Sequence, residues 1–328
     1  MKRSLAALGM TLLAAAAAEA PAQTAAGLQV YPSHPLRLIV PFPPGGSTDI
    51  LARALSQKLA EGLAQPVVID NRPGAGGTIG AEAAAKSAAD GYTILMGQLG
   101  PLAVSPALYK KLPYDPVKSF APVSLMAIVP SVLVVNNALP VSSAAELIAY
   151  AKKHPGELTY GSAGNGSTSH LTTEYFKLAT GTDILHVPYK GVGPMLTDLV
   201  SGQLAMGING GPAVMPHVTS GRLRALAVTS LTRVPSLPSI PTLDESGVKG
   251  FDANGWYGIV APAGTPREIV MRLNTEIRRA VDSPELRARL DAEGAIPAAG
   301  TPEAFAAHIA SEIARWGEVV KRAGMEPQ

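Results

Sequence analysis

The sequence predicts an α/β fold of two domains, each a mixed sheet flanked by helices. The chain has 328 residues, enough for about two domains of ordinary size. Short apolar segments alternate with segments of helical periodicity, an order typical of a mainly parallel sheet that binds ligands at the carboxyl ends of its strands. Two long apolar segments, residues 123–135 and 254–261, suit strands that cross between domains. We expect a first domain of residues 23–130 plus 254–328, a second of residues 131–253, and hinges near 123–135 and 250–260.

The composition excludes several classes of protein. Hydrophobic residues make up 47% of the chain and charged residues 16%, so a large core is possible and disorder is not expected. The net charge is +2 and Lys and Arg form no run, which argues against a nucleic-acid partner. The chain has no cysteine, so it carries neither disulfides nor a thiol for a lipid. We expect a monomer held together by its core alone.

The first residues have the pattern of a cleaved export signal. Lys2 and Arg3 precede an apolar run, Leu5–Ala18, and small residues follow it up to Ala22. A membrane anchor is the alternative, but a span needs about 20 apolar residues and this run is shorter. We therefore expect a signal peptide of residues 1–22 and a freely diffusing protein in the periplasm.

Residues 36–63 predict a strand, a glycine turn and a helix. Leu36–Val40 is a short apolar run, and the prolines and glycines after it forbid both strand and helix. Hydroxyl and carboxylate residues that can cap a helix follow directly. The first turn of such a helix has unpaired N–H groups and the positive end of the helix dipole, which suit an anion, most simply a carboxylate. A tight turn without a ligand fits the same pattern. The candidate ligand residues here are Phe42, Pro44, Gly46, Ser47, Thr48 and Asp49.

A second strand, Val67–Asp70, leads into Gly74 and Gly76 in a pattern close to a dinucleotide-binding fingerprint. The third glycine of that fingerprint would fall at position 79, which is Ile79. We therefore expect no nucleotide cofactor, only a turn into a small-residue helix over residues 78–88.

A third strand, Tyr92–Gly97, ends just before Gln98. Because ligands bind at the carboxyl ends of parallel strands, this amide is a candidate to contact ligand. It could equally hold the loop in place.

The design of strand, glycine turn and helix recurs in the middle of the chain. Ser143 and Glu146 form a capping box for a helix that ends near Lys153. A short strand, Leu158–Gly161, then leads into a Gly/Ser turn and an amphipathic helix. Two such turns, one from each domain, can face each other across a cleft, so the repetition favours ligand binding by both. The candidates in this turn are Ser162, Ala163, Gly164, Gly166, Ser167, Thr168 and His170.

Two further strands, Ile184–Pro188 and Leu204–Asn209, also end in glycine-containing turns. After the first of them a helix begins near Met195. Lys190 could supply a cation for a carboxylate, or it could be a solvated turn residue. The candidates at these two strand ends are Tyr189, Lys190, Gly191 and Asn209.

In the rest of the chain the sequence predicts secondary structure and no ligand-binding residue. Leu223–Thr229 is a strand, and the Pro- and Ser-rich segment over residues 231–241 is a surface loop. Thr301 and Pro302 suit the N-cap and first position of a final helix. Helices are expected over residues 267–281, 285–293 and 303–322.

Catalytic and metal sites are the alternatives to a binding site. Ser167, His170 and Asp183 could supply a nucleophile, a base and an orienting acid, but no Gly-x-Ser-x-Gly motif surrounds the serine. The six histidines show no spacing typical of metal ligands. We therefore expect no catalytic residue and no metal, and His170 is either pocket-lining or structural.

Four segments of the chain resemble the substrate-binding proteins of tripartite tricarboxylate transporters, the Bug or TctC family. They are PSHPLRLIVPFPPGGSTDILARAL, VVIDNRPGAGGTIGAEAAAKSAADGYTILMG, GSAGNGSTSHLTTEYFK and HVPYKGVGPMLTDLVSGQ. The segments occur in the family's order and the likeness covers nearly all of the mature chain. The resemblance implies a type II periplasmic binding protein that closes on its ligand like a Venus flytrap and delivers it to the membrane components of a transporter. A sensory adaptor for a membrane receptor, or a hydrolase on the same scaffold, is the alternative.

The resemblance also implies how a ligand is held. In the family, backbone N–H groups, hydroxyls and ordered waters bind the ligand rather than an arginine, so Lys190 ranks below Ser47, Thr48, Ser167 and Thr168. The family pattern has Phe-Asp or a similar pair at the strand end where this chain has Ile208-Asn209. Loss of that carboxylate removes a partner for a ligand amine. We therefore expect a dicarboxylate or an aromatic carboxylate without an amine, and micromolar binding of aspartate or glutamate in calorimetry would contradict this.

Overall fold

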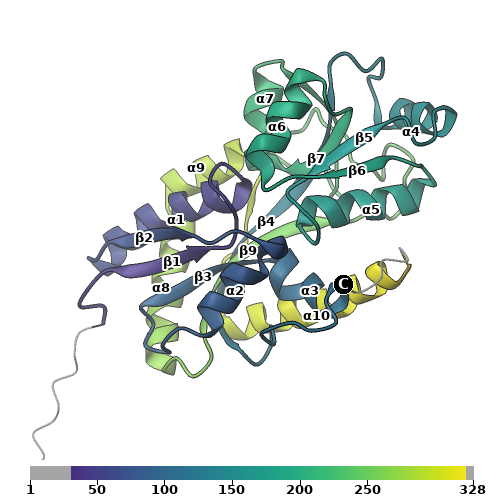
Figure 1. Ribbon diagram of the computed structural model, residues 1–328. Helices are drawn as coiled ribbons and strands as arrows, with labels where there is room; N and C mark the ends of the chain where they lie inside the picture. The colour runs from purple at the N-terminus through teal and green to yellow at the C-terminus, as the bar shows by residue number, and fades with distance from the viewer. Residues whose placement is uncertain (1–30, 323–328) are drawn as a thin grey trace, which may run out of the picture. The chain divides into compact units, whose positions relative to one another are not determined.

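One mixed sheet runs through the structure, a computed structural model that describes residues 31–322 (Figure 1). The expected signal peptide, residues 1–22, lies outside the described residues. The strands are β1 (Leu36–Val40), β2 (Val67–Asn71), β3 (Thr93–Gln98), β4 (Phe120–Asn136), β5 (Thr159–Ser162), β6 (Leu185–Pro188), β7 (Met206–Gly210), β8 (Leu223–Val228), β9 (Asn254–Pro262) and β10 (Ile296–Pro297). The helices are α1 (Ser47–Leu63), α2 (Thr78–Ala85), α3 (Ser105–Leu108), α4 (Ala144–Lys153), α5 (Thr168–Thr180), α6 (Val192–Ser201), α7 (Gly211–Thr219), α8 (Arg267–Asp282), α9 (Pro284–Ala292) and α10 (Pro302–Arg322), with a 3₁₀ turn, η1 (Ala75–Gly77), and a π-helical turn, η2 (Gly100–Val104).

Strand β4 joins the two halves of the sheet, whose order is β2-β1-β3-β9-β4-β7-β5-β6. Residues 120–130 of β4 pair with β9, and residues 131–135 pair with β7. We call the elements on the β9 side of this switch the first lobe and those on the β7 side the second lobe; Figure 1 shows β4 passing between them. Both lobes belong to one compact unit that begins at Pro32. The domain boundaries expected from the sequence stay a prediction.

The sheet is mixed, as the sequence predicts. Strands β1, β2 and β3 pair in parallel in the first lobe, as do β5, β6 and β7 in the second. Strands β4 and β9 instead pair antiparallel with their neighbours. The reason is their path, because a strand that arrives from the other lobe enters the sheet against the direction of the βα units.

Helices cover both faces of each half of the sheet (Figure 1). In the first lobe, α1 packs on β1 and β2 and contacts α8 and α9, whereas α2 packs on β3 and α10 on β4. In the second lobe, α5 packs on β5 and β7, while α6 and α7 contact each other and β4. The carboxyl ends of β1, β3, β5 and β7 therefore meet the helices that follow them.

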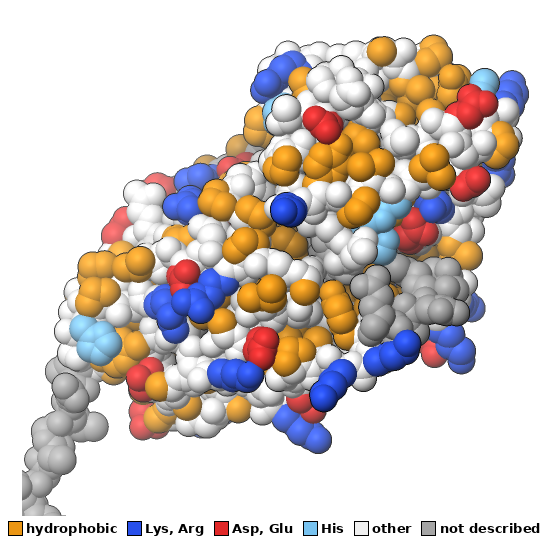
Figure 2. Space-filling view, in the orientation of Figure 1, with side chains coloured by type: hydrophobic (Ala, Val, Ile, Leu, Met, Phe, Trp, Pro, Cys, Tyr) orange, Lys and Arg blue, Asp and Glu red, His pale blue; other side chains and the backbone are white. Residues whose placement is uncertain are grey.

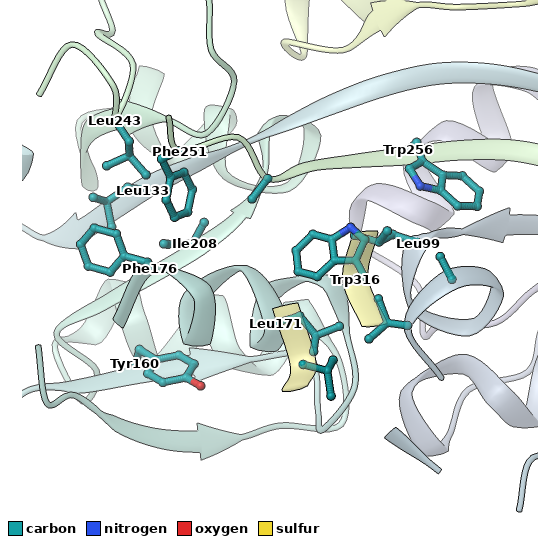
Figure 3. Packing of buried hydrophobic residues seen from close by; sticks show 14 of the residues in the cluster. Leu99, Leu133, Tyr160, Leu171, Phe176, Ile208, Leu243, Phe251, Trp256 and Trp316 are labelled. Atoms are coloured by element: carbon teal, nitrogen blue, oxygen red, sulfur yellow. The ribbon is translucent and has the colours of Figure 1, made fainter. Parts of the chain in front are cut away.

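A hydrophobic core extends through both lobes (Figure 3). Figure 3 shows Phe176 and Phe251 near one end of this core, Trp256 near the other and Trp316 between them. The indole nitrogens of both tryptophans donate to the same carboxylate oxygen of Glu312, each at 3.2 Å. One buried carboxylate thus fastens β9 to α10, and a buried donor–acceptor set of this kind helps to fix the first lobe.

The predicted element boundaries are largely confirmed. Helix α10 begins at Pro302, and the Thr301 hydroxyl accepts from the Ala304 N–H at 3.1 Å. Ser143 caps α4 by accepting from the Glu146 N–H, and the Glu146 carboxylate accepts from the N–H and hydroxyl of Ser142. A hydrogen bond from the Ser143 backbone also helps to lower the pKa of Glu146, as in the predicted capping box.

Two other predicted helix boundaries are wrong. The second helix ends at Ala85, three residues early, and the helix expected from Met195 begins at Val192 because Gly191 supplies its N-cap. The sequence analysis missed η2, α3 and α7, all of which contain proline in or near the first turn. Proline is tolerated there because the first N–H groups of a helix have no internal partner.

Charged side chains are mixed on the face that Figure 2 shows, where basic and acidic groups alternate across both lobes. In the part of the chain that the structure describes, no helix combines the length and the apolar character needed to span a membrane.

Candidate ligand-binding site

The carboxyl ends of strands from both lobes meet at a small inner cavity. The cavity is small, with a volume of about 40 Å³. Helices α1, α5 and α7 begin at its edge, and α6 begins beside it. Its lining residues are Phe42, Pro43, Gly46, Ser47, Thr48, Gln98, Val129, Ser131, Ala163, Ser167, Thr168, Ser169, Val192, Asn209, Gly210, Gly255 and Tyr257.

Helix α1 presents its N-terminus to this cavity without a side-chain cap. Its N-cap is Gly46, in an extended conformation, and no side chain accepts from the first turn. Ser47 and Thr48 are therefore the first residues of the helix, buried to 5% and 4% exposure, and not its caps as the sequence suggests. The N–H groups of a first helical turn lack intrahelical acceptors, so this end of α1 can donate to a ligand.

Asp49 faces away from the cavity and holds the turn together. Its carboxylate accepts from Arg53, from Asn71 and from the Gly45 N–H. Burial raises the pKa of Asp49, but the hydrogen bonds from Arg53, Asn71 and Gly45 outweigh it and hold the pKa below its usual value. Asp49 is thus ionised and paired inside the first lobe.

Helix α5 starts at the opposite wall and has a side-chain cap. The Ser167 hydroxyl donates to the Gly164 carbonyl at 2.6 Å and accepts from the His170 N–H at 3.4 Å. The Ser169 hydroxyl accepts from the Ala163 N–H at 3.0 Å. These bonds fix the Gly/Ser turn and commit Ser167 to capping.

Two stacked histidines support this turn from behind. The Gly166 N–H donates to Nδ1 of His170 at 3.3 Å, and the Ser162 hydroxyl pairs with Nε2 of His186 at 2.6 Å. The two imidazoles stack with centroids 4.4 Å apart, and His186 stacks in turn on Tyr160. Burial lowers the pKa of His170, and burial together with the neighbouring His170 lowers the pKa of His186 to about 4. Both rings are therefore neutral at pH 7.

The two lobes touch across the cavity at glycines. A Cβ on Gly191 would lie 2.7 Å from Cγ of Pro43, and one on Gly76 would lie 2.7 Å from the Asn165 carbonyl. Both glycines also have positive φ, 133° and 63°. Two hydrogen bonds join the lobes at longer range: Ser47 Oγ donates to the Gly210 carbonyl at 3.4 Å, and Thr168 Oγ1 donates to Gln98 Oε1 at 3.4 Å.

Tyr257, on β9, supplies a phenol beside the start of α1. It is 6% exposed, and its hydroxyl neighbours those of Ser47 and Thr48. Burial raises its pKa to about 12, against the opposing effect of these hydroxyls. The phenol therefore stays protonated at pH 7 and can donate to a ligand.

A larger outer hollow of about 560 Å³ adjoins the inner cavity and shares Phe42, Pro43 and Ala163 with it. The hydroxyl of Tyr109 donates to the Ala75 carbonyl at 3.1 Å, and that of Tyr189 donates to Asp198 at 2.5 Å. Their rings, with proline and glycine backbone, form the walls. The other lining residues are Pro73, Gly74, Gly76, Gly77, Gly164, Asn165, Pro188 and Lys190.

The electrostatics of the inner cavity come from neutral groups. Its lining contains no Asp, Glu, Lys, Arg or His among the described residues. Helix N-termini and hydroxyls supply the polar contacts, and helix N-termini bind anions through N–H groups and the helix dipole. The arrangement can therefore hold a negatively charged group by hydrogen bonds.

Comparison with known proteins agrees with this geometry. The sequence model described as tripartite tricarboxylate transporter family receptor, TctC, matches residues 51–325. The chain belongs to this TctC receptor family. It is 44% identical over 325 residues to the protein BugT of Bordetella pertussis, covering 99% of this chain and 98% of that protein.

Solved structures of TctC-type proteins share the fold. The R. palustris protein Rpa4515, solved with adipate, has a TM-score of 0.88 and 44% identity, covering 91% of this chain and all of its own. The periplasmic binding protein BugD has a TM-score of 0.87 and 38% identity, covering 91% of this chain and 100% of its own. MatC from Rhodopseudomonas palustris, solved with malate, has a TM-score of 0.83 and 35% identity, covering 88% of this chain and 100% of its own. The predicted two-domain periplasmic-binding-protein fold is thus confirmed.

This TctC-family chain brings half of the predicted site residues to the inner cavity. They are Phe42, Gly46, Ser47, Thr48, Gln98, Ala163, Ser167, Thr168 and Asn209. Three more predicted residues line only the outer hollow: Gly164, Tyr189 and Lys190. Six predicted residues line neither: Pro44, Asp49, Ser162, Gly166, His170 and Gly191. Most of these six hold the turns or the contact between lobes.

The sequence analysis missed several lining residues. Ser131 and Tyr257 lie within apolar crossing strands, where the pattern predicts core and gives no sign of a site. The others are Pro43, Val129, Ser169, Val192, Gly210 and Gly255. Pro43, Ser169 and Gly210 directly adjoin predicted residues, so a wider window around each glycine turn would have included them.

The stacked histidines predict a loss of stability in acid. Both have a folded-state pKa below the ordinary 6.5, so the folded state favours their neutral forms. Their contribution to the free energy of unfolding is complete above about pH 6.5. It is lost as the pH falls toward about 4, the pKa of His186. Protonated His170 also cannot accept from the Gly166 N–H. We expect the melting temperature of the ligand-free protein to be flat from pH 8 to 6.5 and to fall between pH 6.5 and 4.

The double variant His170→Gln, His186→Gln provides the control for this prediction. It should melt lower at pH 7 and show a shallower fall between pH 6.5 and 4. If the melting temperature falls equally steeply with pH in the variant and the parent, the loss of stability in acid comes from other groups.

Proposed function

We propose that this TctC-family chain is an exported periplasmic receptor that binds a small dicarboxylate or aromatic carboxylate and delivers it to the membrane components of a tripartite tricarboxylate transporter. The observation that carries the proposal is the uncapped start of α1, aimed into a cavity whose lining has no charged side chain among the described residues. Structures related to this chain hold adipate and malate, both dicarboxylates.

Ligand entry requires the lobes to separate. The inner cavity is only about 40 Å³ in volume, and the lobes approach each other closely over it, as at Gly191 and Pro43. We propose hinges at residues 123–135 and 250–260 and domains of residues 23–130 plus 254–328 and 131–253. Opening about β4 and the start of β9 would admit the acid, and closure would be what the transporter recognises.

The energetics of such binding need no arginine. Micromolar affinity corresponds to about 8 kcal/mol. Hydrogen bonds to a charged group contribute about 1.5–3 kcal/mol each, and α1, Tyr257 and the hydroxyls around them offer several. Closure and loss of ligand freedom offset part of this sum.

The local chemistry also favours binding over catalysis. The Ser167 hydroxyl donates to a carbonyl, and Nδ1 of His170 accepts from a backbone N–H. The serine and the imidazole are thus each engaged with the backbone, which suits a scaffold for a ligand released unchanged.

A thermal-shift screen of carboxylic acids tests the proposal. A ligand at 100 times its dissociation constant adds about 2.7 kcal/mol to the free energy of unfolding, which corresponds to a rise of several degrees in melting temperature. We expect at least one acid among succinate, malate, adipate, benzoate and terephthalate to cause this rise in the mature chain. The matching neutral amides should cause none. Absence of a shift with every acid would contradict the proposal.

A further inference from the structure

Asn209, at the end of β7, carries a buried amide that nothing in the described structure satisfies. The side chain lines the inner cavity and the residue is 1% exposed. Neither Nδ2 nor Oδ1 has a hydrogen-bond partner. Buried polar groups in native proteins are paired with few exceptions, so this amide requires an explanation.

Other buried asparagines of the chain show how the fold normally treats such an amide. Nδ2 of Asn136 donates to the Leu199 carbonyl at 2.8 Å, and its Oδ1 accepts from the Ala138 N–H at 2.8 Å. Nδ2 of Asn274 donates to two carbonyls at 2.8 and 2.7 Å. Asn209 differs from both because it lies on the cavity.

Two strand neighbours of Asn209 offer it no polar side chain. Its register partner on β4 is Val132, and a Cβ built on Gly207, two residues back on the same face of β7, would lie 3.0 Å from Nδ2. The amide therefore lies beside a valine and a glycine of the sheet and borders the cavity, from which a ligand group can reach it.

The chemistry of an amide restricts that partner. Nδ2 has two donor hydrogens and Oδ1 has two acceptor lone pairs. A carboxylate only accepts, so beside Asn209 it would leave Oδ1 without a donor. An ammonium only donates, and the described lining of the cavity has no Asp or Glu to balance its charge. A hydroxyl both donates and accepts, so it can satisfy either atom of the amide.

We infer that Asn209 recognises a hydroxyl group on the ligand, next to the carboxylate held by the start of α1. This inference rests on the proposed carboxylate-binding function and narrows it to hydroxy-substituted acids. Asn209 is then the residue that selects a hydroxy acid over the unsubstituted acid and over the amino acid of the same carbon skeleton.

Calorimetric titration of the mature chain with two matched series tests the inference. The first series is succinate, malate and aspartate, and the second is adipate, 2-hydroxyadipate and 2-aminoadipate. In at least one series the hydroxylated member should bind about tenfold or more tightly than the unsubstituted member, which corresponds to one satisfied hydrogen bond. The amino member should bind more weakly than the hydroxylated one.

Variants then locate the selectivity. Asn209→Leu keeps the size of the side chain and should reduce the hydroxyl preference to about onefold. Asn209→Asp should shift the preference toward the amino member by about tenfold, because it restores a negative charge. Asn136→Leu is the matched control: it should lower the melting temperature and leave the ligand preferences unchanged.

Two results would overturn the inference in different ways. Equal binding of hydroxylated and unsubstituted acids, or a hydroxyl preference that survives in Asn209→Leu, would refute the role of Asn209 while the carboxylate-binding function stands. Failure of all six acids to bind would refute that function and the inference with it. Retention of the melting transition in Asn209→Asp shows that its altered preference is not a folding defect.

Discussion

Replacing Ser47 with proline is expected to weaken carboxylate binding about 10- to 150-fold, the equivalent of one charge-assisted hydrogen bond of roughly 1.5–3 kcal/mol. Proline at the first helical position removes a backbone N–H and keeps the helix, because that N–H has no internal acceptor. The preceding residue, Gly46, is already extended, at φ −89° and ψ 167°, as a residue before proline has to be. The substitution therefore tests the backbone donor directly.

Ser47→Ala separates the N–H from the hydroxyl. It removes the weak bond from Ser47 Oγ to the Gly210 carbonyl, 3.4 Å long, and leaves the N–H in place. Titration with the best acid from the screen should show a loss of affinity in the proline variant well beyond that in the alanine variant. If both variants lose affinity equally, the hydroxyl and not the backbone binds the acid, and the proposed role of the helix terminus fails.

How far the sequence predicts this site is clear from its two glycine turns. Both turns, and the helices after them, follow from local rules: proline and glycine end a strand, and periodic leucines begin a helix. The N-cap of α1 does not follow, since Gly46 is followed by three residues that could each cap. None of the three caps the helix: Gly46 is the N-cap, and Asp49 pairs with Arg53 and with Asn71, which comes from another strand.

The residues contributed by the crossing strands could not be predicted. Ser131 and Tyr257 lie in apolar runs whose pattern indicates only burial. They reach the site because β4 changes partners between Pro130 and Ser131 and because β9 pairs beside β3 and β4. Such pairing joins residues 71 to 165 positions apart along the chain, so a local sequence pattern cannot predict it.

Helix α7 shows that local sequence patterns also fail to predict some secondary structure. Pro212 and Pro216 both lie in it, and proline within a segment argues against a helix. Pro212 is in the first turn, where it costs nothing. Pro216 is tolerated because Ala213, Val214 and Met215 pack into the second-lobe core. Tertiary packing thus overrides a local propensity.

Replacing Gly191 with alanine is expected to weaken ligand binding about 100-fold or more by holding the lobes apart. The new Cβ would lie 2.7 Å from Cγ of Pro43, which belongs to the opposite lobe. Gly191 also has φ 133°, a conformation that L-residues rarely adopt, so some stability is lost within the second lobe itself, at about 1–3 kcal/mol. Small-angle scattering measures closure directly: the parent should become more compact on adding ligand, and the variant should not.

Two controls distinguish the contact between lobes from strain within one lobe. Gly193→Ala places a Cβ two residues further on, where the nearest neighbouring atom, the Pro44 carbonyl oxygen, is 4.0 Å away, so affinity and compaction should both persist. Pro43→Ala removes the Cγ that Gly191→Ala meets. The backbone strain at position 191 does not depend on Pro43. The double variant Pro43→Ala, Gly191→Ala should therefore bind more tightly than Gly191→Ala only if the clash between the two residues acts across the cleft. Failure of Pro43→Ala to restore either affinity or compaction would mean that the backbone conformation of Gly191 matters and that closure does not depend on this contact.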